Sequence, residues 1–398
     1  MEVGVVGKPN VGKSTFFNAA TLLDVPIAPY PFTTLEPNRG VGAVRVPCPH
    51  AERGVACTPG NAACVRGTRW VPVNLVDVPG LVPGAHEGKG LGHRFLDDLR
   101  AADGFLQIVD VTGTTGPDGA IGAPGSSDPA EEVRWLADEL VAWIAEILSR
   151  DFLRHARAVE LDGTKPEVFL SGRLTGLSID TAAILRAVRG TGIDTTHPSR
   201  WTDEERSRLA RALLDSAKPR LVVANKCDRV GPDVPERLAG AIDPIPVVAT
   251  SAEAELTLRR AARAGLVDYA PGDPAFTVPD PARLSGPQTK ALDGIRHLLA
   301  AWGSTGVQRA LETMVFDRLG FMVVFPVEDE THWTDSRGRV LPDALLVPAA
   351  LPAKALAYRV HSDLGDHFIR AVDGRTHRAL AADQPLTPGA VVRIVARR

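Results

Sequence analysis

The sequence predicts an α/β fold in which a doubly wound, parallel-rich sheet is interrupted by a helical insertion and followed by a small α+β domain. Three observations carry this prediction: short apolar runs without alternation recur along the chain, glycine or polar residues follow each run, and helix-like patterns separate them. Continuous apolar runs are typical of parallel strands buried on both faces, and ligands bind where such strands end.

Five apolar runs are predicted as strands of the main sheet: residues 3–6, 71–76, 105–109, 221–224 and 247–249. Between the third and fourth runs, residues 113–127 are rich in Gly, Pro, Ser and Thr, which predicts a loop. Apolar residues then recur at helical spacing from Val133 to Leu148, and Thr202 with Glu205 forms a capping box that begins another helix. We therefore expect a helical excursion over residues 128–217.

The C-terminal part has a different character. Residues 270–287 are rich in Pro and Gly and read as a connector, and helical patterns follow at 289–301 and 306–319. Beyond these, strands are predicted at 321–327, 345–347, 368–372 and 391–395, with one helix over 351–364. A small module with this order of elements fits a β-grasp fold.

Length and composition narrow the class of protein. A chain of 398 residues predicts two or three domains, and its net charge of −3 predicts no general attraction to nucleic acid. No apolar run approaches the roughly 20 residues of a membrane helix, and the first residues lack a basic signal-peptide region. We expect a cytoplasmic protein, a monomer, that binds neither DNA nor membranes. Four cysteines in this length do not indicate a disulfide scaffold.

The first motif follows the first predicted strand. The run from Gly7 to Ser14 matches G-x-x-x-x-G-K-[ST], a phosphate-binding loop whose backbone N–H groups face phosphate oxygens. Its lysine reaches the β- and γ-phosphates, and its serine hydroxyl is a ligand of Mg²⁺. The less specific alternative is a glycine turn before a helix. The predicted phosphate-binding residues are Gly7, Lys8, Pro9, Asn10, Val11, Gly12, Lys13, Ser14 and Thr15.

Residues at the ends of three further predicted strands indicate which nucleotide the protein binds. Asp77 can hold Mg²⁺ through water, and Gly80 can meet the γ-phosphate. In Asn225-Lys226-Cys227-Asp228, the final carboxylate can accept two hydrogen bonds from guanine, a donor pair that adenine does not supply. Ser251 and Ala252 then offer backbone N–H groups to the guanine carbonyl. The order and placement of these motifs predict a GTPase.

The motifs resemble those of the Obg-related GTPases. Tyr30-Pro31-Phe32-Thr33-Thr34, the run from Asp77 to Ala85 and the glycine-rich run from Gly84 to Gly92 carry the resemblance, which is nearest to the YchF subgroup in its archaeal form and spans essentially the whole chain. The resemblance implies a C-terminal TGS domain and association with the ribosome or ribosomal RNA. It also makes Thr34 a Mg²⁺ ligand, with Ser14 and Asp77, and Gly80 the γ-phosphate sensor. Many YchF proteins carry Glu where this chain has Asp228 and prefer ATP, so Asp228 favours GTP.

The resemblance also bears on hydrolysis. Leu81 stands where Ras-like enzymes carry a water-orienting glutamine, so intrinsic turnover should be slow. Related GTPases use an asparagine at the position of Asn10 to coordinate K⁺ beside the phosphates; the alternative is that Asn10 only fixes the loop. The predicted catalytic residues are thus Lys13, Thr34, Gly80 and Asn10. His86, five residues beyond Leu81, can be a solvated loop residue or can help to place water.

A cluster of metal-ligand residue types stands apart from these motifs. Cys48, His50, Cys57 and Cys64 have the right chemistry for Zn²⁺ and lie in a segment rich in Pro and Gly. Their spacing lacks a tight C-x₂-C pair, so a loop with reduced thiols is the alternative.

The leading hypothesis is a translation-linked GTPase switch. Alternatives are an ATPase, and a ribosome or RNA adaptor that rarely turns its nucleotide over. The predicted domains are a GTPase domain (1–127 and 218–275), an inserted helical domain (128–217), a helical connector (276–316) and a TGS domain (317–398).

Overall fold

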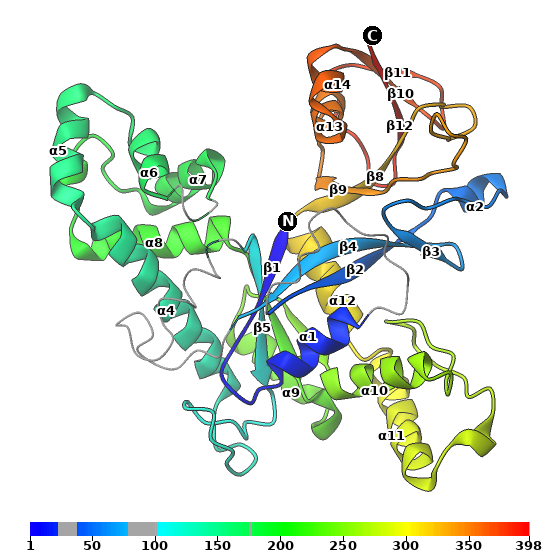
Figure 1. Cartoon of the computed structure of the whole chain (residues 1–398). Coiled ribbons are helices and arrows are strands. Elements are labelled where there is room, and N and C mark those ends of the chain that lie inside the picture. The colour runs from blue at the N-terminus through cyan, green and yellow to red at the C-terminus, as the bar shows by residue number, and fades with distance from the viewer. Residues whose placement is uncertain (23–37, 79–99, 101, 175–176, 178, 398) are drawn as a thin grey trace. The chain divides into compact units, whose positions relative to one another are not determined.

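The computed structural model describes residues 1–22, 38–78, 100, 102–174, 177 and 179–397 of the chain (Figure 1). These residues form two compact units. Residues 1–22, 38–40 and most of 74–310 belong to the first unit, and residues 41–73 and 311–397 belong to the second. No helix within the described residues is both long and apolar enough to cross a membrane.

The main sheet has the order β2-β4-β1-β5-β6-β7, with β3 paired to β4. Strand β1 is parallel to β4 and to β5, β5 is parallel to β6, and β6 is parallel to β7, whereas β3 runs antiparallel to β4. Strands β5 and β6 are buried along their whole length, as expected for central parallel strands. The strands are β1 (Glu2–Val6), β2 (Arg39–Pro47), β3 (Ala63–Val65), β4 (Thr68–Asp77), β5 (Gly104–Asp110), β6 (Arg220–Asn225) and β7 (Val247–Thr250).

The sheet brings the carboxyl ends of its parallel strands to one edge. Residues that follow β1, β4, β5, β6 and β7 therefore meet there, as in other doubly wound sheets. Helix α1 (Lys13–Thr21) packs against α10 (Ala252–Arg263), while α4 (Pro129–Ser149) and α9 (Asp233–Ala241) contact β5 and β7, respectively. The predicted fold class is confirmed.

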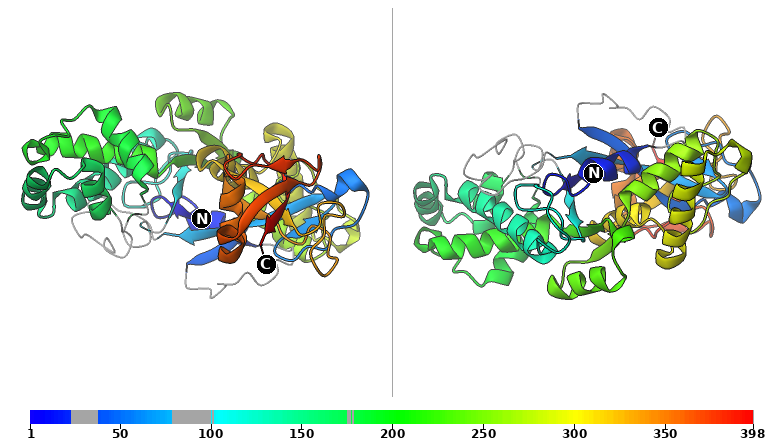
Figure 2. Two further views of the ribbon diagram at one scale, coloured as in Figure 1. Left: turned by 90° about the horizontal axis from the view of Figure 1, so that it is seen from above. Right: turned by 90° about the horizontal axis from the view of Figure 1, so that it is seen from below.

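The insertion between β5 and β6 consists of helices that share one core. All three views show α4 to α8 gathered together (Figures 1 and 2). Asp128 caps α4 with Pro129 at its first position, and Thr202 with Glu205 closes the predicted capping box of α8. The helices are α4 (Pro129–Ser149), α5 (Phe152–Asp162), α6 (Pro166–Leu174), α7 (Thr181–Thr191) and α8 (Asp203–Ala217).

Helix α11 (Gly286–Trp302) also begins with a capping box, formed by Ser285 and Gln288. Its apolar side chains pack with α10 and with Tyr269 and Phe276 in a separate core. Helix α12 (Val307–Glu312) continues into a π-helical segment, Thr313–Arg318.

The second unit contains a mixed sheet of five strands within the described residues, with the order β11-β10-β12-β8-β9. Strands β8 and β12 are parallel, and the other pairs are antiparallel. Leu356 of α13 packs on Val324 and Val392 of this sheet in one apolar core. The elements are α2 (His50–Arg53), β8 (Phe321–Val327), β9 (Leu345–Pro348), α13 (Ala353–Val360), α14 (Ser362–Asp366), β10 (Phe368–Asp373), β11 (Ala379–Leu380) and β12 (Val391–Ala396).

Two expectations from the sequence need correction. The predicted single helix over 351–364 is two helices, because His361 adopts an extended conformation and its Nδ1 accepts a hydrogen bond from the N–H of Asp363, which starts α14. Strand β2 was not predicted, since glycine and arginine interrupt its apolar residues. The domain boundaries given above stay predictions.

Candidate functional site

The loop between β1 and α1 has the backbone that the phosphate-binding motif requires. Gly7 and Gly12 have φ values of 147° and 99°, in the region that favours glycine. A Cβ on Gly7 would lie 2.4 Å from the carbonyl oxygen of Ile108, and one on Gly12 would lie 2.3 Å from Nδ2 of Asn225. Only glycine fits either position, so the loop curls tightly at the amino end of α1, where a phosphate is favoured.

Three predicted residues meet above this loop. Lys13 Nζ donates to the carbonyl oxygen of Lys8 at 2.7 Å, and Ser14 Oγ donates to Oδ2 of Asp77 at 3.2 Å. Burial lowers the pKa of Lys13, against the attraction of Asp77 and Glu132. Burial also raises the pKa of Asp77, against the opposing effects of Lys13 and Ser14. Oδ1 of Asp77 is buried and has no hydrogen-bond partner within the described residues.

The side chain of Lys8 is buried against the inserted helices. Its Nζ lies 3.3 Å from Oε2 of Glu132, in the first turn of α4, and both side chains are about 5 % exposed or less. Burial raises the pKa of Glu132 to about 7, although the positive charge of Lys8 opposes the rise. The sequence reasoning missed Glu132, whose partner is remote in sequence. The pair connects the phosphate-binding loop to the inserted helices.

Asn225 joins two of the predicted motifs. Its Nδ2 donates to the carbonyl oxygen of Val11 at 2.9 Å, and its Oδ1 accepts from the N–H of Ala252 at 3.1 Å. A single amide thus connects the phosphate-binding loop, the end of β6 and the start of α10. This side chain is buried, and its hydrogen bonds fix the edge of the site.

Lys226 bridges the same loop and a carboxylate that the sequence reasoning missed. Its Nζ donates to the carbonyl oxygen of Asn10 at 3.1 Å and to Oδ2 of Asp110 at 2.8 Å. Burial works against ionisation of Asp110, but hydrogen bonds from Lys226 and from three hydroxyls hold its pKa well below the ordinary value. Asp110 is the last residue of β5, and an acidic residue at the end of a parallel strand is the sequence feature that could have identified it. The hydroxyls belong to Thr112, Thr114 and Thr115.

Asp228 borders a cavity of about 200 Å³ at this edge of the sheet. Its carboxylate is partly exposed and lies 3.8 Å from Nε of Arg229, which the sequence reasoning had not singled out. The cavity adjoins the phosphate-binding loop, because Gly12 and Thr15 line it, and it is large enough for part of a planar base. Its lining is Gly12, Thr15, Asn225, Lys226, Asp228, Arg229, Ala252 and Glu253.

The N–H groups predicted to meet a base carbonyl already have partners. Ser251 donates to the carbonyl oxygen of Thr305 at 2.9 Å, and Ala252 donates to Asn225. Ser251 is the N-cap of α10, and Asn225 reaches Ala252 from the end of β6. The N–H of Glu253, in the first turn of α10, has no hydrogen-bond partner in the described part of the chain. Glu253 also lines the cavity.

Asn10 has a left-handed backbone conformation, with φ 65°. Its Nδ2 donates to the carbonyl oxygen of Gly119 at 2.9 Å, which connects the phosphate-binding loop to the predicted 113–127 loop. Pro9 lies against the same glycine, since a Cβ on Gly119 would be 2.7 Å from the proline Cβ. The amide oxygen of Asn10 takes no part in this bond.

Four predicted residues, Thr34, Gly80, Leu81 and His86, lie outside the described residues. Their roles stay predictions.

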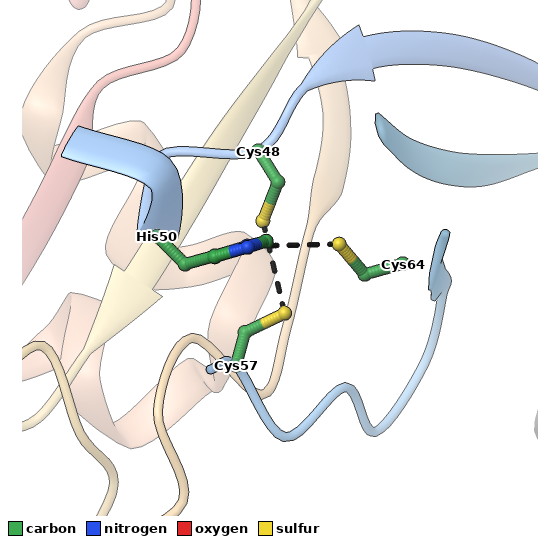
Figure 3. Close-up of side chains that lie close together, drawn as sticks. All are labelled: Cys48, His50, Cys57 and Cys64. Atoms are coloured by element: carbon green, nitrogen blue, oxygen red, sulfur yellow. Dashed lines mark hydrogen bonds between the residues drawn. The ribbon is translucent and has the colours of Figure 1, made fainter. Parts of the chain in front are cut away.

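The four cysteine and histidine residues lie in the second unit and converge (Figure 3). Cys48 follows β2, His50 begins α2, Cys57 lies in the next loop and Cys64 lies in β3. Their ligand atoms all lie within 4.8 Å of one another.

Comparison with known proteins agrees with this geometry. The family described as 50S ribosome-binding GTPase matches residues 2–140, and the one described as Obg-like GTPase YGR210-like, G4 motif-containing domain, matches residues 223–329. A GTP-binding protein of Methanocaldococcus jannaschii is 42 % identical over 396 residues, 99 % of this chain and 98 % of its own.

Two solved structures are also similar. The crystal structure of a GTP binding protein from Pyrococcus horikoshii is 33 % identical and covers 100 % of both chains with a TM-score of 0.81. The YchF GTPase of Schizosaccharomyces pombe is 18 % identical and covers 99 % of this chain and 97 % of its own, with a TM-score of 0.59, which supports the fold. The chain belongs to the Obg-like, YchF-related family of P-loop GTPases.

Proposed function

We propose that the protein is a Mg²⁺-dependent GTPase that acts as a conformational switch on the ribosome. The observation that carries the nucleotide assignment is Asp228, which borders the cavity beside the phosphate-binding loop. A carboxylate there accepts hydrogen bonds from guanine N1–H and the 2-amino group, whereas adenine presents no such pair of donors. The N–H of Glu253 is the proposed donor to the guanine carbonyl.

Other residues are proposed to bind the phosphates, to position the loop and to respond to the γ-phosphate. Backbone N–H groups of the loop from Gly7 to Gly12, Pro9 excepted, and the Lys13 ammonium hold the phosphates, where negative charge develops during transfer of the γ-phosphoryl group to water. Lys226 and Asn225 keep the loop in place through the bonds described above. The resemblance assigns Thr34 and Gly80 to the response to the γ-phosphate.

The residues present fit Mg²⁺. The buried Oδ1 of Asp77 has no hydrogen-bond partner within the described residues, and Ser14 Oγ donates a hydrogen bond to Oδ2 of the same carboxylate. Ser14, Asp77 and Thr34 are the proposed protein groups around the ion, which neutralises phosphate charge when bound. We also propose K⁺ beside the phosphates, with the amide oxygen of Asn10 as a ligand.

The ribosome is the proposed partner of a TGS domain at residues 317–398. From Ala357 onward the sequence contains seven Arg, three His and four Asp, so this end is mildly basic in an acidic protein. Arg359, Arg370 and Arg378 are exposed. Such a surface suits phosphate contacts with ribosomal RNA, whose strength falls as salt rises.

Turnover of GTP and ATP, measured with and without ribosomes and in K⁺ or Na⁺, tests the proposal. We expect slow GTP hydrolysis that ribosomes and K⁺ accelerate. An ATPase would turn ATP over at least as fast as GTP, and an adaptor would bind ribosomes without acceleration; either result would reject the proposal. A chain truncated before residue 317 that still cosediments normally with ribosomes would reject the assigned contact surface.

A further inference from the structure

We propose that Cys48, His50, Cys57 and Cys64 bind a structural Zn²⁺ ion that holds residues 48–69 against the C-terminal part of the second unit. We call these four residues the Cys/His cluster. The proposal concerns a site outside the nucleotide-binding residues and does not depend on the GTPase assignment. It rests on ligand geometry, on a buried arginine and on the contacts that the segment makes.

The geometry of the Cys/His cluster is that of a four-coordinate site. Sγ of Cys48 lies 3.9 Å from Sγ of Cys57, and Sγ of Cys64 lies 3.6 Å from Nδ1 of His50 (Figure 3). A tetrahedral ion with Zn–S bonds of about 2.3 Å and a Zn–N bond of about 2.0 Å places such ligand pairs about 3.5 to 3.8 Å apart. All four ligand atoms are already within 4.8 Å of one another.

The chemistry of the ligands selects the ion. Three thiols and one imidazole are soft and borderline ligands, which favour Zn²⁺ over Mg²⁺ or Ca²⁺. Four protein ligands leave no open position, so the site is structural rather than catalytic. All three cysteines are free, and Cys48 is only 2 % exposed.

A buried arginine supplies the charge that a Cys₃His site needs. Zn²⁺ with three thiolates carries one excess negative charge, which is costly in the interior unless it is paired. Arg69 is fully buried, and its Nη2 lies 3.5 Å from Sγ of Cys48 and 2.8 Å from the carbonyl oxygen of Leu341. Its Nε and Nη1 have no hydrogen-bond partner in the described part of the chain. A negatively charged metal centre explains why a guanidinium is buried here.

The segment that the ion would fix packs on the C-terminal residues of the same unit. Thr58 and Gly60 donate backbone hydrogen bonds to the carbonyl oxygens of Val340 and Pro342, at 2.8 and 2.6 Å. Asn61 exchanges two hydrogen bonds with the backbone of Ala344. These hydrogen bonds all come from the loop between Cys57 and Cys64. Metal ligation by the two cysteines that bound this loop would hold it against residues 340–344.

Helix α2 makes a second set of contacts beside His50. Glu52 forms two hydrogen bonds of 2.7 Å with Arg375. Arg53 places its guanidinium 5.0 Å from the ring centroid of Trp333 and donates to the carbonyl oxygen of Thr331. Ligation of His50 would fix the start of this four-residue helix, which is too short to be stable alone.

Metal analysis of the full-length protein tests the site. After incubation with Zn²⁺ and removal of unbound metal, the wild-type protein should retain about one zinc ion per chain. Cys57→Ser/Cys64→Ser should retain less than about a tenth of that, whereas Cys227→Ser should retain the wild-type amount, because this buried cysteine lies outside the cluster. A wild-type protein without zinc, one that binds iron instead, or a double variant that keeps its zinc would overturn the proposal.

Two measurements on the wild-type protein avoid dependence on the variants. Replacement of zinc by Co²⁺ should give the absorption bands of tetrahedral, thiolate-bound Co²⁺, and octahedral spectra would contradict the ligand set. Zinc removal should speed hydrogen exchange of the amides of Thr58, Gly60 and Ala344 by at least about tenfold, while amides between β10 and β12 stay unchanged. Equal exchange with and without zinc would show that the ion does not hold this segment.

Discussion

The nucleotide site of the first unit and the Cys/His cluster of the second unit are built in different ways. In the proposed nucleotide site, the contiguous loop of residues 7–14 supplies most of the groups, and strand ends bring Asp77 and Asn225 beside it. In the Cys/His cluster, four side chains converge from the residue that follows β2, from α2, from a loop and from β3, and only the fold brings them together. A site made from local backbone leaves a strong motif in the sequence, whereas a site made from dispersed side chains leaves only residue types.

The largest expected effect concerns the lysine of the phosphate-binding loop. Lys13→Ala should weaken GDP and GTP binding by about 100-fold, because the ammonium group forms charged hydrogen bonds to phosphate that water does not replace in a buried site. Titration with a fluorescent guanine nucleotide measures this. Lys290→Ala, an exposed lysine on α11, is the control and should bind normally. Normal binding by Lys13→Ala would mean that the loop acts through its backbone alone.

The Lys8–Glu132 pair tests whether a buried contact between the loop and the inserted helices stabilises the first unit. Above pH 7, where Glu132 is ionised, Lys8→Met should reduce the free energy of unfolding by about 3 kcal/mol or more, since it leaves a buried carboxylate without its partner. Lys8→Met/Glu132→Leu should recover most of this loss. Denaturant titration of the single and double variants measures both values. Additive losses in the double variant would show that the two side chains do not interact.

The raised pKa of Glu132 predicts a pH dependence. The folded protein keeps this proton up to pH about 7, whereas the unfolded chain releases it near the ordinary glutamic acid pKa of 4.5. The resulting stabilisation is present below pH 4.5 and is lost as pH rises through 7, at a cost of about 3 kcal/mol. Glu132→Gln should be less sensitive to pH between 5 and 8 than the wild-type protein. Parallel stability profiles for both proteins would place the titration elsewhere.

The smallest expected effect separates two roles of Asn10. If its amide oxygen binds K⁺, Asn10→Ala should remove a several-fold acceleration of GTP hydrolysis by K⁺ over Na⁺. If its bond to Gly119 only fixes the loop, the variant should lose activity equally in both salts. Asn18→Ala, an exposed residue of α1, should keep the wild-type response. Steady-state turnover in matched K⁺ and Na⁺ buffers distinguishes the two roles.

The sequence predicted most of the first unit because its signals are local. The apolar runs of β1, β5 and β6 were long enough to recognise, and the capping box at Thr202 placed the start of α8. Strand β2 was missed because its edge position tolerates glycine and arginine. A single helix was predicted over residues 351–364 because the helical spacing of apolar residues continues past His361. The break between α13 and α14 lies in the backbone conformation of His361, which this spacing does not reveal.

Side chains that act across long sequence separations could not be predicted. Glu132 is far from Lys8 in the sequence, and Arg69 donates a hydrogen bond to the carbonyl oxygen of Leu341, which is 272 residues away in the sequence. The N–H groups of Ser251 and Ala252 were expected to be available, but Thr305 and Asn225 already accept from them. Each of these contacts depends on how elements pack, which a linear pattern does not encode.

The selectivity of Asp228 tests the central claim, that this chain is a guanine-nucleotide switch. Competition titrations should show that the wild-type protein prefers GTP over ATP by at least about 100-fold, because adenine supplies neither of the two donors that the carboxylate accepts. Asp228→Asn should shift the preference to xanthosine triphosphate, and Asp233→Asn, on the exposed side of α9, should leave it unchanged. Equal competition by ATP and GTP for the wild-type protein would contradict the account.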